Sequence, residues 1–268
     1  MPRIKEIVDI MEQLAPSCTQ ADFDNSGFQA GDIEARTDKV LCALELNEGV
    51  IDMAARQGAG LIITHHPLIF QPLSTVTSES YEGRLLLKLL REGVALYSSH
   101  TPLDACRGGV NDCLCELIGM FDITGFYTQS VLNGQNVYCC RVGYIEPESL
   151  EALADRLGKA LKSGFVRFSC GRQDKAHKIA VCSGSGSGLT EEIIALGADT
   201  FITGELKYHD MLKLKEAGIA TIEAGHYHTE YPVIPRIISH LQNRLNELQY
   251  KTAVLDAGFI DPYYSKSY

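Results

Sequence analysis

A strand–helix–strand pattern occurs twice in this chain, and it limits the possible folds more than any other feature of the sequence. Residues 58–64 (GAGLIIT) resemble residues 197–203 (GADTFIT), and in each half a second match follows, residues 90–95 (LREGVA) with residues 215–220 (KEAGIA). Short β-favouring runs that alternate with helices are typical of parallel βαβ units. We therefore expect an α/β fold with mixed or parallel sheets, built from two related domains with pseudo-twofold internal duplication.

The length of 268 residues suits two ordinary domains. We expect a first α/β domain over residues 1–128 and a second over residues 129–268. Residues 136–172 differ in pattern from both repeats, with a strand–helix–strand order and no cluster of charges, which indicates a structural role. A long C-terminal helix, from about Thr229 to Leu248, is able to pack back on the first domain.

Composition excludes several classes of function. A net charge of −10 argues against a general nucleic-acid surface or an anionic-membrane surface. No apolar run is long enough to cross a bilayer, and the first residues form an amphipathic pattern rather than a signal peptide. The nine cysteines are odd in number and contain no Cys-x-x-Cys pair, which favours reduced thiols. We expect a cytoplasmic protein.

Histidines gather where predicted strands end. Six of the eight histidines lie in such loops, together with two carboxylates. These residues are His65, His66, His100, Asp104, His209, His226, His228 and Glu230. Polar residues beyond the carboxyl ends of parallel strands lie where ligands bind. Imidazoles mixed with carboxylates and without thiolates suit zinc, iron, manganese, cobalt or nickel. So many ligands exceed one tetrahedral site, so we expect two divalent ions, as in centres that hydrolyse bonds.

Two local arrangements leave alternatives open. Neighbouring strand residues point to opposite faces, so His65 and His66 serve one site only if the strand ends there; otherwise each serves a different ion. His226 and Glu230 are four residues apart, a spacing that places both on one face of a helix. However, Thr229 has the character of an N-cap, which predicts His226 in the preceding loop and Glu230 in the first turn.

A glycine-rich turn, with Gly184, Gly186 and Gly188, follows a predicted strand. This is the position of a phosphate-binding turn, but the spacing fits neither the dinucleotide-binding fingerprint nor the P-loop. We expect a tight strand-to-helix turn, with contact to an anionic substrate as the alternative.

Several motifs together resemble one family, the GTP cyclohydrolase 1 type 2 homologues, also called NGG-interacting-factor-like proteins. The motifs are His65-His66-Pro67, Ser99-His100-Thr101-Pro102-Leu103-Asp104, Thr203-Gly204-Glu205, Gly225-His226-Tyr227-His228-Thr229-Glu230, Asp24-Asn25-Ser26-Gly27 and Gly184-Ser185-Gly186. The resemblance implies a dinuclear metal centre, a ring-shaped homohexamer and a short form without the large inserted domain. The implied ligands are His65, His66, Asp104, His226 and Glu230.

The expected function is a dinuclear metal-dependent hydrolase of a small substrate, with nucleotides among the candidates. The alternative is a regulatory, adaptor or storage protein that binds metal without turnover. His100 lies outside the implied ligand set, and we expect it to be catalytic, carrying protons beside the metals. Its alternative role is to orient Asp104 through a hydrogen bond.

Overall fold

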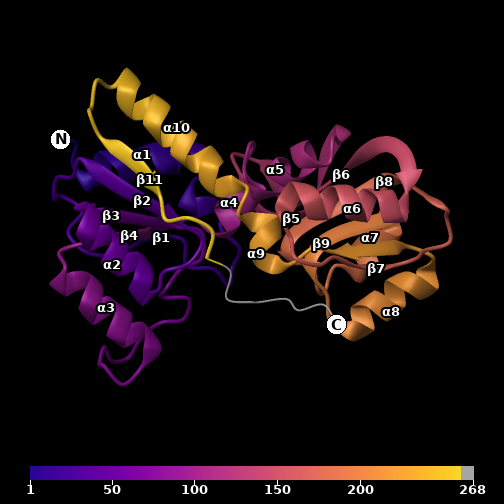
Figure 1. Cartoon of the computed structure of the whole chain (residues 1–268), viewed down its shortest axis with the longest axis horizontal. Coiled ribbons are helices and arrows are strands. Elements are labelled where there is room, and N and C mark those ends of the chain that lie inside the picture. The colour runs from indigo at the N-terminus through magenta and orange to yellow at the C-terminus, as the bar shows by residue number, and fades with distance from the viewer. Residues whose placement is uncertain (261–268) are drawn as a thin grey trace. The chain divides into compact units, whose positions relative to one another are not determined.

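The structure is a computed structural model that describes residues 1–260 (Figure 1). Two compact units make up the chain. Unit 1 contains Met1–Cys106 and Ile234–Ile260, and unit 2 contains Arg107–Val233. The boundary expected after residue 128 falls within strand β5 (Phe121–Leu132), which lies in unit 2.

Unit 1 is built on a five-stranded sheet with the order β1-β4-β3-β2-β11. Its strands are β1 (Gly27–Ala30), β2 (Lys39–Ala43), β3 (Leu61–Thr64), β4 (Ala95–Ser98) and β11 (Ala253–Asp256). All neighbours are parallel except β1, which pairs antiparallel with β4. The carboxyl ends of β3 and β4 therefore lie at the same edge of the sheet.

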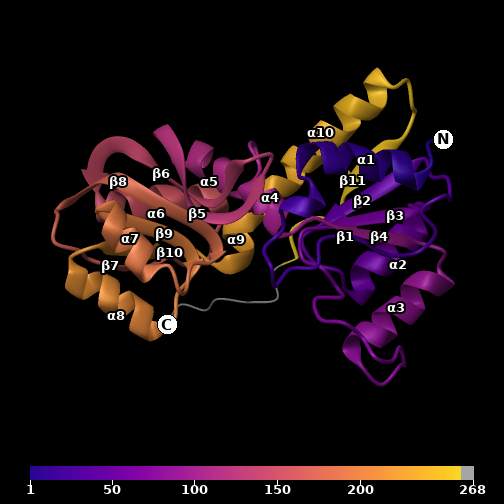
Figure 2. The same cartoon turned by 180° about the vertical axis from the view of Figure 1, so that it is seen from behind.

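Helices cover both faces of this sheet (Figure 1 and Figure 2). The helices of unit 1 are α1 (Ile4–Leu14), α2 (Glu48–Gln57), α3 (Tyr81–Arg91), α4 (Thr101–Ala105) and α10 (Val233–Glu247), with a 3-10 turn, η1 (Ser17–Thr19). Helices α2 and α3 share a buried cluster with Ile62 and Leu96 of the sheet. In both views α1 and α10 lie on the opposite side of the sheet from α2 and α3.

Local chemistry sets the limits of α2. The side chain of Asn47 accepts a hydrogen bond from the backbone N–H of Val50, which satisfies one of the exposed donors at the helix start. Gly58 ends the helix in the left-handed conformation, with φ 70°. The chain can then turn directly into β3, which leads to the paired histidines.

Unit 2 contains a six-stranded sheet with the order β5-β6-β8-β9-β10-β7. The strands are β5 (Phe121–Leu132), β6 (Gln135–Ser149), β7 (Arg167–Ser169), β8 (Lys175–Ser185), β9 (Thr200–Glu205) and β10 (Ala220–Glu223). Its helices are α5 (Val110–Leu117), α6 (Leu150–Leu161), α7 (Thr190–Leu196), α8 (Tyr208–Ala217) and α9 (His226–Glu230). Because β6 pairs with β5 and β8, and β7 pairs with β10, both strands within residues 136–172 belong to this sheet.

The core of unit 2 follows the alternation of strand residues. In β8, Ile179 and Val181 belong to the buried cluster that contains α6, whereas Ala180 and Cys182 belong to the cluster that contains residues of α7 and α8. Successive strand side chains point to opposite faces, so one strand supplies two hydrophobic layers. The unit is therefore a three-layer helix–sheet–helix arrangement.

The two sheets share a central pattern. In each, three consecutive parallel strands (β2-β3-β4 and β8-β9-β10) are followed at one side by an antiparallel strand, β1 or β7. The mixed α/β class is thus confirmed, and the shared strand pattern agrees with the expected internal duplication. Within residues 1–260, none of the helices combines the length and apolar character that crossing a bilayer requires.

Candidate metal-binding site

Three histidines meet beyond the carboxyl ends of β3 and β4 in unit 1. The strand β3 ends at Thr64, directly before His65 and His66, so the two rings are not forced to opposite faces. Their ring centroids lie 4.7 Å apart, and the ring of His100 is 5.2 Å from each of them. The candidate ligand atoms of the three imidazoles all lie within 4.8 Å of one another. We call His65, His66, His100 and Asp104 the unit 1 cluster.

Each ring in this cluster is held at Nδ1 by an oxygen atom. His65 Nδ1 lies 2.9 Å from the carbonyl oxygen of Ser99, and His66 Nδ1 lies 2.7 Å from Oε1 of Glu45. A carbonyl or carboxylate oxygen accepts a hydrogen bond, which favours the tautomer with hydrogen on Nδ1. The lone pair is then on Nε2, which is the arrangement found for metal-binding histidines.

Asp104 comes from the short helix α4, which begins directly after His100. Its Oδ1 atom lies 3.6 Å from Nε2 of His65, whose side chain is fully buried. A carboxylate at this position adds negative charge next to the imidazole nitrogens. The unit 1 cluster therefore offers the mixed nitrogen and oxygen donors that suit a divalent transition metal.

His100 is oriented by Asp24. The Nδ1 atom of His100 lies 2.9 Å from Oδ1 of Asp24, whose side chain is buried. Burial alone would raise the pKa of Asp24, but the hydrogen bond and charge of His100 and the hydroxyls of Thr101 and Ser26 hold that pKa well below its usual range. Asp24 is thus an ionised acceptor that fixes the His100 ring.

In unit 2, His226 and Glu230 lie on one face of α9. Nε2 of His226 is 3.2 Å from Oε1 of Glu230, and its Nδ1 is 3.2 Å from Oε1 of Glu205 at the end of β9. Burial lowers the pKa of His226, but the two carboxylates outweigh it and raise this pKa to about 9. This group, the unit 2 cluster (Glu205, His226 and Glu230), therefore favours a positive charge at its centre.

The N-cap expected at Thr229 is wrong. The cap lies four residues earlier, at Gly225, in a conformation of φ 93° and ψ 134° that favours glycine. The Oγ1 atom of Thr229 instead donates towards the carbonyl oxygens of Gly225 and His226 and accepts a hydrogen bond from the N–H of Gly184. His226 is consequently helical, and the spacing of four residues brings it to Glu230.

The glycine-rich turn forms a wall of the unit 2 cluster. Gly184 has φ +61°, and a Cβ atom at this position would overlap Oε1 of Glu230 and lie 3.1 Å from Nε2 of His226. At Gly204, a Cβ atom would lie 2.7 Å from the Cα of His226. The absence of side chains at these two glycines allows α9 to approach the ends of β8 and β9.

Two strand-end histidines have other surroundings. His209 lies in the first turn of α8, exposed, with its ring 5.6 Å from that of Tyr208. His228 lies in α9, where its Nδ1 would be 2.9 Å from a Cβ atom at Gly225. The ligand geometry described above therefore involves His65, His66, His100 and Asp104 in unit 1, and His226 and Glu230 in unit 2.

Three carboxylates of this arrangement were not selected as site residues from the sequence, although Asp24 and Glu205 lie in motifs that carry the family resemblance. Glu45, Asp24 and Glu205 each contact an Nδ1 atom. A usable signal existed for two of them, because Glu45 lies two residues beyond the end of β2 and Glu205 is the last residue of β9. The strand-end rule that selected the histidines also covers these positions.

Comparison with known proteins agrees with the resemblance seen in the motifs. The sequence profile of the Duf34/NIF3 (NGG1p interacting factor 3) family matches residues 2–258. This chain belongs to that family. A Duf34/NIF3 relative from Clostridium acetobutylicum, named GTP cyclohydrolase 1 type 2 homolog, is 34% identical over 264 residues, which covers 97% of this chain and 98% of the relative.

Further relatives extend the comparison. A Helicobacter pylori protein named GTP cyclohydrolase 1 type 2 is 30% identical and covers 91% of this chain and 95% of its own length. The crystal structure of a hypothetical protein from Staphylococcus aureus has a TM-score of 0.88 at 26% identity, covering 98% of this chain and 99% of that one. A Bacillus cereus protein related to NIF3 has a TM-score of 0.91 at 21% identity, covering 99% of both chains, which shows the shared fold.

Proposed function

We propose that this Duf34/NIF3 chain is a metal-dependent hydrolase that holds two divalent ions through His65, His66, Asp104, His226 and Glu230. The observation that carries the proposal is the orientation of the three histidines. Each has its Nδ1 atom next to an oxygen, from Ser99, Glu45 or Glu205, which favours hydrogen on Nδ1 and the lone pair on Nε2, as in metal-binding histidines. These donors fit zinc, iron, manganese, cobalt or nickel.

Metal ions bound in pairs polarise the reacting oxygen of a substrate and make water a stronger nucleophile near neutral pH. The residues of the chain have separate tasks around them. The imidazoles of His65, His66 and His226 would supply nitrogen donors, with His226 losing its proton when an ion binds, and Asp104 and Glu230 would offset the cationic charge. Glu45 and Glu205 keep two of the rings in a fixed orientation, which reduces the reorganisation that binding requires.

His100 is the proposed proton carrier. The carboxylate of Asp24 accepts a hydrogen bond from Nδ1, so Nε2 of His100 can accept a proton from water or from the substrate and release it to the leaving group. The ring lies beside those of His65 and His66, so its Nε2 is within reach of the same small volume. This pairing of a buried carboxylate with an imidazole fixes the tautomer that general-base action needs.

The substrate is proposed to be small and nucleotide-like. The support comes from the names of the relatives, which are GTP cyclohydrolase 1 type 2 or its homologs. Opening the ring of a purine base by water requires attack on an electron-poor carbon and proton transfer to a ring nitrogen. The two metals and His100 would provide these two functions.

Elemental analysis combined with an activity screen tests the proposal. The protein is purified without chelator, reconstituted separately with each candidate metal, and assayed with nucleotides and with general esterase and phosphatase substrates. We expect two ions per chain and turnover of at least one substrate. A ceiling of one ion per chain contradicts the dinuclear centre. Two bound ions with no turnover of any substrate favour a storage or adaptor protein.

We further propose that the chain assembles with copies of itself into a ring-shaped hexamer, as the family resemblance implies. Support comes from strand β5, which forms one edge of the unit 2 sheet and carries exposed apolar side chains. Ile123 is 39% exposed, Tyr127 47% and Val131 60%. A long apolar edge strand is a surface that other chains pair with, and a second copy of this chain would cover it.

A further inference from the structure

A recess with a volume of about 250 Å³ lies in unit 2 next to His226. Its lining includes Phe165, Arg167, Glu205, Glu223 and Tyr227 in addition to His226. We propose that this recess, the strand-end recess, binds a planar nitrogen heterocycle of the substrate by stacking on Phe165 and by N–H groups that donate to Glu205 and Glu223. The inference rests on the proposed function, because it identifies the substrate class of the same site.

The recess lies at the carboxyl ends of two neighbouring parallel strands. Strand β9 ends at Glu205 and β10 ends at Glu223, and both residues line the recess. The carboxyl ends of parallel strands are where ligands bind in sheets of this kind. His226 belongs to both the recess and the unit 2 cluster, so a group held here lies beside a proposed metal ligand.

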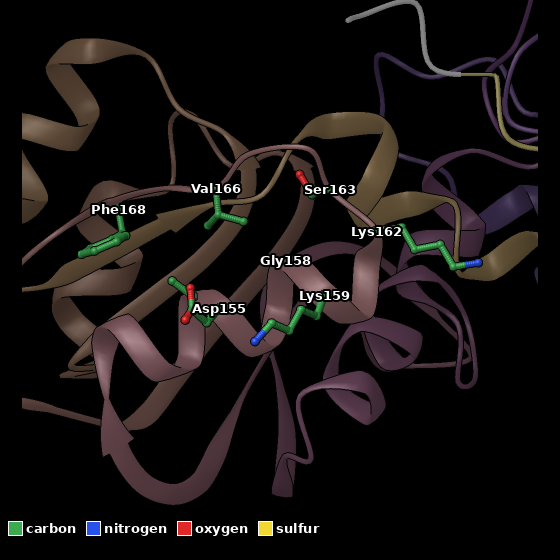
Figure 3. Close-up of a pocket in the computed structure, with 8 residues that line it drawn as sticks. Asp155, Gly158, Lys159, Lys162, Ser163, Val166 and Phe168 are labelled. Atoms are coloured by element: carbon green, nitrogen blue, oxygen red, sulfur yellow. The ribbon is translucent and has the colours of Figure 1, made fainter. Parts of the chain in front are cut away.

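The exposed aromatic ring of Phe165 is the second argument. Phe165 is 53% exposed, although a large apolar side chain usually gains by burial. Phe165 and Arg167 line the recess, whereas Val166 and Phe168 line a different pocket with residues of α6 (Figure 3). This alternation is that of an extended segment, and it gives the recess an aromatic wall on one face only.

The carboxylates of the lining favour a ligand that carries N–H donors. The guanidinium of Arg167 already lies 2.8 Å from Oε2 of Glu223, directly across the β7–β10 pair. Glu205 and Glu223 thus bring four carboxylate oxygens to one recess, more than Arg167 alone engages. Carboxylate oxygens accept hydrogen bonds, so this lining suits N–H groups on the edge of a ring.

The size of the recess restricts the ligand further. Pockets for drug-sized ligands have volumes of roughly 300–1,000 Å³. The recess is smaller, so it accommodates one ring system rather than a whole nucleotide. Aromatic stacking tolerates any planar base, while the carboxylates select rings that carry N–H groups on one edge. The favoured ligand class is therefore a purine-like or pteridine-like ring with adjacent ring and exocyclic N–H donors.

Isothermal titration calorimetry with guanosine tests the inference. The metal-reconstituted full chain is titrated with guanosine, with 1-methylguanosine and with ribose. We expect saturable binding of guanosine, weaker binding of 1-methylguanosine because its N1 has no hydrogen, and no binding of ribose. Phe165→Ala should weaken guanosine binding at least about fivefold, the lower end of what one stacked base contributes, and Phe165→Tyr should restore it.

Phe168→Ala is the matched control, because Phe168 is 45% exposed on the opposite face of the same segment. It should leave guanosine binding unchanged. Failure of wild-type protein to bind guanosine, unchanged binding by Phe165→Ala, or an equal loss in Phe168→Ala would overturn the inference. If guanosine binding depends on Phe165 but no substrate is turned over, the recess binds the ring and the hydrolase proposal is wrong. If turnover is the same in wild type and Phe165→Ala, the protein is a hydrolase but the recess does not bind its substrate.

Discussion

At the scale of single residues, the imidazoles of the two clusters differ from ordinary core histidines in what their Nδ1 atoms contact. His66, His100 and His226 each have a carboxylate oxygen within 3.2 Å of Nδ1, from Glu45, Asp24 and Glu205. A histidine buried only for packing has no need of an ionised partner on the ring edge away from its neighbours. An oxygen partner at Nδ1 is instead typical of histidines that bind a metal through Nε2.

Glu45→Ala tests this orientation directly. The carboxylate of Glu45 lies 2.7 Å from His66 Nδ1, so its loss frees the ring to rotate and to change tautomer. We expect metal affinity to fall roughly 10–100-fold, measured by competition with a chromogenic chelator. Glu45→Gln, whose amide oxygen still accepts a hydrogen bond, should retain part of the affinity.

Glu48→Ala is the control for this change, because Glu48 is a nearby carboxylate whose ion pairs in the described part of the chain are with Arg84 and Lys88, away from the histidines. It should leave metal affinity unchanged. If Glu45→Ala and Glu48→Ala behave alike, Glu45 does not position His66.

His100→Ala separates catalysis from metal binding. His100 lies outside the ligand set that the family resemblance implies, and Asp24 holds its ring at Nδ1, so we expect both ions to remain while turnover falls roughly 10²–10⁴-fold. Elemental analysis and steady-state rates on the substrate found in the screen give the two measurements. Parallel loss of metal and activity would make His100 a ligand, which its closeness to His65 and His66 allows.

At the scale of secondary-structure elements, the sequence predicted the central strands well and the short or exposed elements poorly. The runs that form β3 and β4 are continuously apolar and bounded by glycine, so their position follows from local pattern. Strand β5 was missed because most of its residues are exposed and show no clean alternation. The sequence does not predict strand β1, because this strand is stabilised by antiparallel pairing with β4, far away in sequence.

The start of helix α9 could not be predicted from local sequence rules. Thr229 has the side chain of an N-cap, and that preference predicted the wrong start. Tertiary contacts decide the outcome, because its hydroxyl is engaged with Gly184 and with the carbonyl oxygens of Gly225 and His226. The candidate ligands could be predicted because they lie at the ends of predicted strands. The residues that orient them could not, because these partners are distant in sequence.

Gly184→Ala tests the close approach of the glycine-rich turn to α9. The added Cβ atom would overlap the carboxylate of Glu230, so α9 must shift and the His226–Glu230 contact must change. We expect metal affinity to fall roughly tenfold or more, as for other changes to groups that orient ligands. Chelator competition measures the affinity, and thermal unfolding measures the accompanying loss of stability.

Gly197→Ala provides the matched control. Gly197 has the same φ of +61°, but a Cβ atom there would meet nothing within 4 Å. Both variants therefore carry the strain of a left-handed alanine, about 1–2 kcal/mol, and only Gly184→Ala adds the overlap. Equal loss of stability with unchanged metal affinity in both variants would remove Gly184 from the site.

At the scale of the whole molecule, strand β5 leaves an exposed apolar edge on the unit 2 sheet. Strand β5 spans twelve residues, and among residues 1–260 its one neighbour in the sheet is β6. Edge strands of monomeric proteins are usually short or carry charged side chains that prevent pairing with other chains. On β5, Ile123, Tyr127 and Val131 are exposed instead, as expected for a surface that another copy covers.

Light scattering behind a sizing column tests the proposed assembly. Wild-type protein at micromolar concentration should show a mass several times the 29.4 kDa of one chain. The double variant Ile123→Lys/Val131→Lys should lower that mass, because two charges would be buried without partners in any interface that covers β5. Leu90→Lys is the control, since Leu90 is 52% exposed on α3 and lies on the other unit. A monomeric wild-type protein contradicts the oligomer. A large assembly that the double variant leaves intact shows instead that chains associate through a surface other than β5.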